Sequence, residues 1–195
     1  MIPLKHSLLI TVAAAAASFP FASGPAPAAG AANWRIDPAR TEIAFAIDAV
    51  GFPRTQGRFD AFEGRIAIDF DRPEKSSVAF HVRAGSVDVG STSFGDYLRS
   101  PAFLDANRHP SIDFVSTSVE KLSDRAVRVS GELTLLGVTK PLTVEVEVER
   151  PPGGKERFEF RAQTRIDRLE FGMNSGFPLV SRDVDLTIRS EAAEL

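Results

Sequence analysis

The sequence predicts an all-β domain, either a sandwich or a closed up-and-down barrel. About eight short segments alternate apolar and polar residues, which is the pattern of strands buried on one face only. Gly, Pro and Asp separate these segments, and only one stretch has the apolar spacing of a short helix. Closure into a barrel would remove the free strand edges through which proteins aggregate.

The first predicted strand covers residues 41–48. Ile43, Phe45 and Ile47 alternate there with residues that are smaller or more polar. The GFPRTQG segment that follows, residues 51–57, is rich in Gly and Pro, and we predict a loop there.

The next strand region runs from residue 59 to residue 70. Its apolar face changes at residues 61–62, which predicts a β-bulge, the usual way in which a strand bends around a barrel corner. Residues 78–83 form a third strand, and residues 86–89 are a candidate for its short extension.

Residues 93–105 interrupt the strand pattern. Phe94, Tyr97 and Leu98 suit a short helix, Pro101 stops it, and Phe103 belongs to the turn that follows. We expect this insertion to close one end of a barrel over a ligand, with the hydroxyl of Tyr97 reaching the polar end of that ligand. The alternative is that these residues only cap a packed core.

A long hairpin at residues 127–149 is the strongest β signal in the chain. Apolar residues occupy every second position of its two halves, and the second half alternates them with Thr and Glu. In the connection, Gly137 can take a positive φ, and Pro141 is expected to belong to the turn. Strands at 158–166 and 184–188 complete one domain, residues 33–195, without repeats or linkers.

Residues 1–32 are predicted to be a secretory signal peptide. Lys5 precedes an apolar run at residues 8–21, and small residues and prolines follow it. That run is shorter than the about 20 apolar residues that span a bilayer, which makes a membrane anchor the weaker alternative. The protein is therefore expected to be periplasmic or secreted.

The composition argues against several kinds of chemistry. The chain has no Cys and therefore no thiol nucleophile, and its net charge is −3 with Lys and Arg scattered, which is not a nucleic-acid footprint. His81 and His109 are isolated and predict no metal site. Asp69 and Asp71 could pair as acid and base, but they lie beside Pro73 and are better interpreted as turn residues.

Phenylalanine dominates the predicted interior. The chain has 15 Phe against one Tyr and one Trp, and most of them occupy inward positions of strands or the helical insertion. A barrel of about eight strands holds either packed side chains or one small ligand. The residues alone are compatible with either a dry, packed core or an apolar cavity.

Four parts of the chain resemble the YceI-like family of bacterial periplasmic proteins, which have a lipocalin-like barrel. Residues 131–142, GELTLLGVTKPL, are similar to the family signature G-x-L-T-(I/L)-x-G-V-T-K-P-V. The family's W-x-I-D-P, L-R-S-x-x-F-F-D … Y-P-x-I-x-F and R-x-D-F-G-M motifs resemble, in the same order, residues 34–38, residues 98–105 with 109–114, and residues 168–173. The resemblance implies a single antiparallel lipocalin-like β-barrel of about eight strands with a short helical insertion.

The polar positions of the family differ in this chain. Where the family has R-D-x-H-L-R-S, residues 94–100 read FGDYLRS. Asp48-Ala49 replaces the Arg-His that ends the family's first strand, and Arg40-Thr41 stands where the family has H-S. The resemblance therefore implies the fold but no particular contacts with a ligand's polar end.

The family also implies a function. It is known for binding isoprenoid-type lipids inside the barrel, so we expect a non-enzymatic protein that sequesters or carries a polyisoprenoid, an isoprenoid quinone or a fatty lipid, without cofactor or metal. A lipid hydrolase or isomerase using the same cavity is one alternative, although an enzyme needs neighbouring ionisable groups that point inward. A second alternative is a stress or surface protein that binds no ligand. The protein could also form a homodimer.

The candidate ligand-binding residues are the apolar side chains predicted to face the interior: Phe45, Ile47, Phe59, Phe80, Val82, Phe94, Tyr97, Leu98, Phe103, Phe114, Leu133, Leu135, Phe160 and Phe171.

Overall fold

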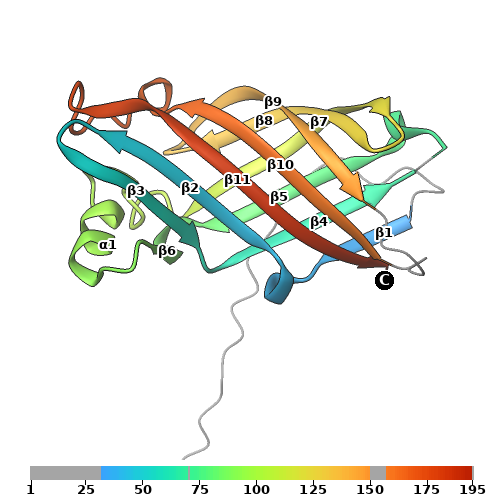
Figure 1. The fold of residues 1–195 in the computed structure, drawn as a ribbon, viewed down its shortest axis with the longest axis horizontal. Coiled ribbons are helices and arrows are strands. Elements are labelled where there is room, and N and C mark those ends of the chain that lie inside the picture. The colour runs from blue at the N-terminus through green and yellow to red at the C-terminus, as the bar shows by residue number, and fades with distance from the viewer. Residues whose placement is uncertain (1–31, 70, 150–156, 195) are drawn as a thin grey trace, which may run out of the picture.

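A computed structural model describes the backbone of residues 32–69, 71–149 and 157–194 (Figure 1). The strands are β1 Ala32–Ile36, β2 Glu42–Ala49, β3 Phe52–Phe59, β4 Phe62–Ile68, β5 Ser77–Arg83, β6 Val87–Asp88, β7 Ser111–Ser123, β8 Ala126–Leu135, β9 Val138–Glu149, β10 Arg157–Asp167 and β11 Val180–Glu194. The helices are α1 Thr92–Arg99 and the short 3-10 turns η1 Pro38–Arg40, η2 Pro73–Lys75, η3 Ala84–Ser86 and η4 Arg168–Phe171. The predicted signal peptide lies outside the described residues, apart from Ala32.

The strands form one antiparallel sheet that returns to its own beginning. Its order is β1-β4-β5-β7-β8-β9-β10-β11-β2-β3-β6, and β1 pairs with both β4 and β11. β1 and β2 lie one after the other along the same edge of β11, so together they fill one strand position, or row, of the barrel. β3 with β4, and β5 with β6, fill two further rows in the same interrupted way. These three rows and the five strands β7 to β11 make a barrel of eight rows, so the predicted fold is confirmed.

A bulge was predicted at residues 61–62, but the structure has a break between two strands, β3 and β4, just before residue 62. β3 ends at Phe59 and β4 begins at Phe62. The other two interrupted rows are broken by η1 and η3. The predicted extension at residues 86–89 is β6, which pairs with β3.

The prediction of a loop at residues 51–57 is wrong, because β3 begins at Phe52. Thr55 lies opposite Ile47, and Gly57 lies opposite Phe45 on β2. A Cβ on Gly57 would come within 2.5 Å of the Phe45 ring, so the residue that suggested a turn makes room for an interior side chain. Tertiary pairing therefore overrides the local turn signals.

The β8–β9 hairpin matches the predicted one, but its turn is shorter. Leu136 and Gly137 take φ values of 54° and 75°, as the two central residues of a type I′ turn do. Pro141 was expected in the turn and instead lies within β9, opposite Glu132. β9 pairs with β10 only from Glu145 to Glu149. Pro141 lies outside this ladder, so its lack of an N–H group costs no hydrogen bond to β10.

The helix α1 and two connections between strands lie at one end of the barrel. In Figure 1, α1 lies at the same end as the β2–β3 turn and the β10–β11 connection, and the C-terminus lies at the other. We call these the α1 end and the far end. No helix in the described part of the chain is long and apolar enough to cross a membrane.

Candidate ligand cavity

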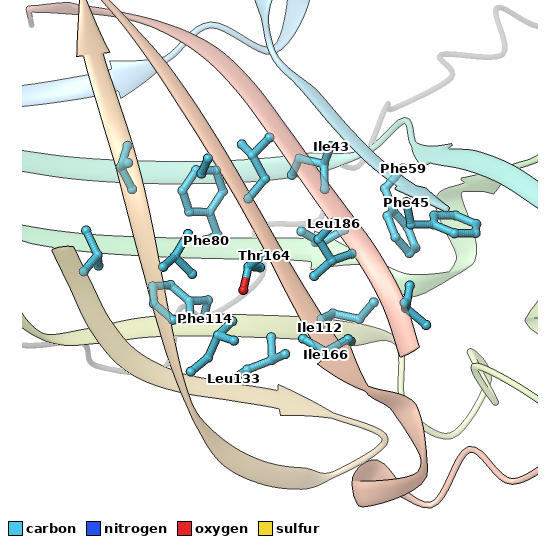
Figure 2. Close-up of a pocket in the computed structure, with 18 of the residues that line it drawn as sticks. Ile43, Phe45, Phe59, Phe80, Ile112, Phe114, Leu133, Thr164, Ile166 and Leu186 are labelled. Carbon is cyan, nitrogen blue, oxygen red and sulfur yellow. The ribbon is translucent and has the colours of Figure 1, made fainter. Parts of the chain in front are cut away.

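The barrel encloses a cavity of about 1300 Å³. Its wall consists mainly of Phe, Ile, Leu and Val that occupy every second position of the strands, as the alternation predicted. Figure 2 shows side chains from opposite walls, such as Phe80, Phe114 and Leu186, pointing into one shared space. The cavity reaches from Phe94 at the α1 end to Lys121 near the β7–β8 turn at the far end.

The structure places almost all of the predicted ligand-binding residues on the wall of this cavity. They are Phe45, Ile47, Phe59, Phe80, Val82, Phe94, Tyr97, Leu98, Phe103, Phe114, Leu133, Leu135 and Phe160. Their contact with a ligand remains a prediction. Apolar wall residues that were left out of the predicted set include Ile43, Ile112 and Leu186, although the same alternation would have found them.

Phe171 was predicted to line the cavity but does not. It belongs to η4, within the β10–β11 connection, where the chain no longer alternates between two faces, and its side chain is buried among other apolar residues. The change from strand to 3-10 turn after Asp167 is the reason for the error.

Glycines make room for the rings of the wall. A Cβ on Gly131 of β8 would lie 2.6 Å from the ring of Phe114, which lies on the neighbouring strand β7. Gly57 does the same for Phe45, whose ring centroid is 5.7 Å from that of Phe59. The bulky side chains are therefore held in fixed positions and leave the interior open.

α1 covers only part of the α1 end, whereas the insertion was expected to close it. Leu98 and Phe103 are buried, and the ring of Tyr97 packs edge-on against Phe103 with centroids 5.1 Å apart. Phe94 and Tyr97 line the cavity and yet remain exposed to solvent. The helix therefore borders an opening at this end.

Thr164 of β10 puts a hydroxyl into the apolar interior. Figure 2 shows its oxygen among apolar side chains that include Phe114 and Leu133. Among the described residues none forms a hydrogen bond with this hydroxyl, which faces the hydrocarbon part of the cavity. The sequence placed Thr164 on the inward face, but nothing local distinguished it from a strand-forming threonine.

Asp69 also borders the cavity, in the turn between β4 and β5. Its carboxylate accepts hydrogen bonds from the backbone N–H groups of Asp71 and Arg72, at 3.2 and 2.9 Å, and from the Arg72 side chain. Burial favours the neutral acid, but the Arg72 hydrogen bonds and charge outweigh it, so the pKa of Asp69 is lowered. These contacts give Asp69 the turn role that the sequence favoured over acid–base chemistry.

Arg168 organises the β10–β11 connection. Its buried guanidinium donates to the carbonyl oxygens of Ser181, Ser175 and Val180 at 2.7, 2.9 and 3.0 Å, and to that of Met173. Burial lowers the pKa of Arg168, and the neighbouring Asp167 carboxylate acts in the opposite direction. One buried side chain therefore binds four carbonyl oxygens along the connection that borders the cavity at the α1 end.

The two histidines of the described residues, His81 and His109, lie away from the cavity wall. His81 Nδ1 is 2.6 Å from Asp113 Oδ1 across the β5–β7 ladder, on the side opposite to Phe80 and Val82. The ring of His109 packs beside Gly137. Within the described residues, no group of three His, Asp or Glu side chains could hold a metal ion.

The fold and the cavity define a class of protein: an eight-row antiparallel barrel with an apolar interior large enough for a ligand. The model of the YceI-like domain matches residues 34–192, and the chain belongs to this family. A relative, protein YceI of Escherichia coli O6:H1, is 34% identical over 184 residues, which cover 91% of this chain and 94% of the relative.

Two solved structures share the fold. BcnA of Burkholderia cenocepacia superposes with a TM-score of 0.75 at 22% identity, over 81% of this chain and 99% of BcnA. A polyisoprenoid-binding domain from Saccharophagus degradans, implicated in plant cell wall breakdown, has a TM-score of 0.68 at 14% identity, over 83% and 98% of the two chains.

Proposed function

We propose that the protein binds a long-chain apolar lipid of the polyisoprenoid or isoprenoid-quinone type inside the barrel and carries it in the periplasm or outside the cell. The observation that carries this proposal is the apolar cavity of about 1300 Å³. Ligand pockets for small molecules usually measure about 300–1,000 Å³, so this space suits a larger ligand. The Saccharophagus degradans domain with the same fold is itself a polyisoprenoid-binding domain.

The wall favours a ligand that consists mainly of hydrocarbon. Transfer of an alkyl chain from water to an apolar environment is favourable by about 0.8 kcal/mol for each CH₂ group. Between Phe45, Phe80, Phe114 and Leu186 the ligand would meet almost no polar groups, and Thr164 offers one hydroxyl. A long isoprenoid chain would match the apolar part of this surface.

The same wall disfavours the enzymatic alternative. General acid–base catalysis needs ionisable groups within hydrogen-bond reach of the reacting atoms. Asp69 is held by its own turn, and Arg168 is engaged by backbone carbonyl oxygens. The Lys121 ammonium lies 2.8 Å from the Asp124 carboxylate in the β7–β8 turn, where both side chains are exposed. We therefore propose a carrier without catalytic residues.

Binding of a defined lipid tests the function. Delipidated protein mixed with a polyprenol should elute from a gel-filtration column with the polyprenol bound, and the lipid recovered from it should be chemically unchanged. Recovery of a hydrolysed or isomerised lipid would favour the enzyme, and protein that elutes without lipid would favour the ligand-free alternative.

Tyr97→Phe is expected to change the lipid that the protein retains without changing its stability. The ring packs on Phe103 in either variant, so only the hydroxyl at the border of the cavity is lost. Lipid retained through purification, measured by mass spectrometry, should decrease or change in headgroup.

Thr164→Val is the matched control, since it also removes one hydroxyl from the wall but does so among hydrocarbon side chains. This variant should retain as much lipid as the wild type. Equal lipid content and equal off-rates in Tyr97→Phe and wild type would show that Tyr97 does not contact the polar end of the ligand.

Export of the protein gives a further prediction. The pattern of Lys5, an apolar run and small residues implies cleavage close to residue 32. The mature protein should begin between Gly24 and Asn33. N-terminal sequencing of protein from the periplasm checks this, and a mature chain that starts with Met1 would exclude it.

A further inference from the structure

Exposed apolar side chains gather at the α1 end. Val50, Phe52, Phe94, Tyr97, Phe177 and Leu179 are between 37% and 76% exposed, and all belong to the β2–β3 hairpin, α1 or the β10–β11 connection. We call these six residues the apolar rim. Among the described residues, the other large apolar side chain with comparable exposure is Leu122, near the far end.

The rim forms one border around the opening of the cavity. The N–H of Val50 donates to the carbonyl oxygen of Leu179 at 2.8 Å, which joins the hairpin to the β10–β11 connection. Phe52, Phe94 and Tyr97 belong both to the rim and to the cavity wall. An apolar surface therefore continues from the outside of the protein into the cavity.

We infer that the apolar rim docks the protein on the surface of a lipid bilayer, so that the cavity opens directly onto the membrane. This inference rests on the proposed function, because direct contact with a membrane would let a long isoprenoid chain enter the barrel without exposing its hydrocarbon to water. Exposed apolar groups insert into the boundary between headgroups and acyl chains in proportion to the apolar area that they bury there.

The charges around the rim favour insertion over attraction to anionic lipids. The Arg54 guanidinium pairs with the carboxylates of Asp48 and Asp185, that of Arg182 with Asp167, and that of Arg99 with Asp96. Because these cations already have carboxylate partners, a zwitterionic bilayer should be sufficient, and binding should depend weakly on salt.

The size of the rim argues against a second copy of this chain as the occupant. A stable protein–protein interface uses about 20–30 residues on each side. The rim contributes six side chains, on three segments that surround an opening. Such a border is small for a dimer but suits shallow insertion into a fluid surface.

Co-sedimentation with phosphatidylcholine vesicles tests this inference. The test variant is Val50→Ser with Leu179→Ser, because both side chains are largely exposed, at 70% and 64%, and neither lines the cavity. We expect its affinity for vesicles to fall about tenfold or more relative to wild type. Leu122→Ser makes the same kind of change at the far end and should bind vesicles as the wild type does.

Solution binding separates this inference from the proposed function. The double variant should still take up detergent-dispersed polyprenol to the same extent as the wild type, while its transfer of polyprenol to vesicles slows by about the same factor as its vesicle affinity falls. Equal vesicle binding by wild type and double variant overturns the docking inference and leaves lipid binding intact. Dimers in sedimentation velocity that the double variant loses would overturn it in favour of a second copy.

Discussion

Replacing Arg168 with leucine is expected to lower the free energy of unfolding by about 3–5 kcal/mol. The guanidinium is fully buried and donates to four backbone carbonyl oxygens, those of Met173, Ser175, Val180 and Ser181. Leucine fills part of the space but leaves these acceptors without their donor, one of them buried and three part-buried. Chemical denaturation of wild type and variant, monitored by circular dichroism, measures the loss.

Arg182→Leu is the matched control. Arg182 lies close in sequence to the carbonyl oxygens that Arg168 binds, but its side chain is exposed and its partner is the Asp167 carboxylate. Exposed ion pairs contribute up to about 1 kcal/mol, so this variant should unfold close to the wild type. Equal losses in the two variants would show that the carbonyl contacts of Arg168 do not stabilise the β10–β11 connection.

Val146→Asp is expected to destabilise the protein by about 3 kcal/mol and to reduce the lipid that it holds. Val146 lies opposite Val127 on β8 and Ala162 on β10, and all three side chains line the cavity. A carboxylate at this position has no hydrogen-bond partner in the wall and replaces apolar surface that would contact the ligand. Denaturation midpoints and extracted lipid give the two readouts.

Glu147→Gln removes a carboxylate from the next position of the same strand. Glu147 is exposed and lies opposite Ala126 and Arg161 on the outer face of the barrel. We expect a change within about 0.5 kcal/mol and unchanged lipid content. If the two variants had the same denaturation midpoint, the register of β9 would be wrong.

Most of the barrel could be predicted because strands buried on one face have a period of two. The alternation in β8 and β9 identified the inward residues of the hairpin before any pairing was known. The same rule failed where contacts between strands determine the conformation of a segment. Residues 51–57 have the composition of a loop, yet Gly57 lies in β3 because the ring of Phe45 requires a residue without a side chain.

The residues of the cavity wall could be predicted for the same reason, and the prediction fails where the strand period ends. Phe171 follows β10 in a 3-10 turn, so its inward orientation could not be extrapolated from the strand. The unpaired hydroxyl of Thr164 and the apolar rim depend on which groups lie nearby in space. Leu179 resembles an ordinary apolar residue in the sequence, and only its position beside Val50 gives it a role.

The lipid content of the native protein tests the central claim most directly. Protein purified without detergent from the periplasm, extracted with organic solvent and analysed by mass spectrometry, should yield close to one long-chain isoprenoid lipid per protein molecule. Val146→Asp should yield less, and Glu147→Gln should match the wild type. Wild-type protein that yields no lipid above the level of an unrelated periplasmic protein, and that also fails to take up added polyprenol, would contradict the account.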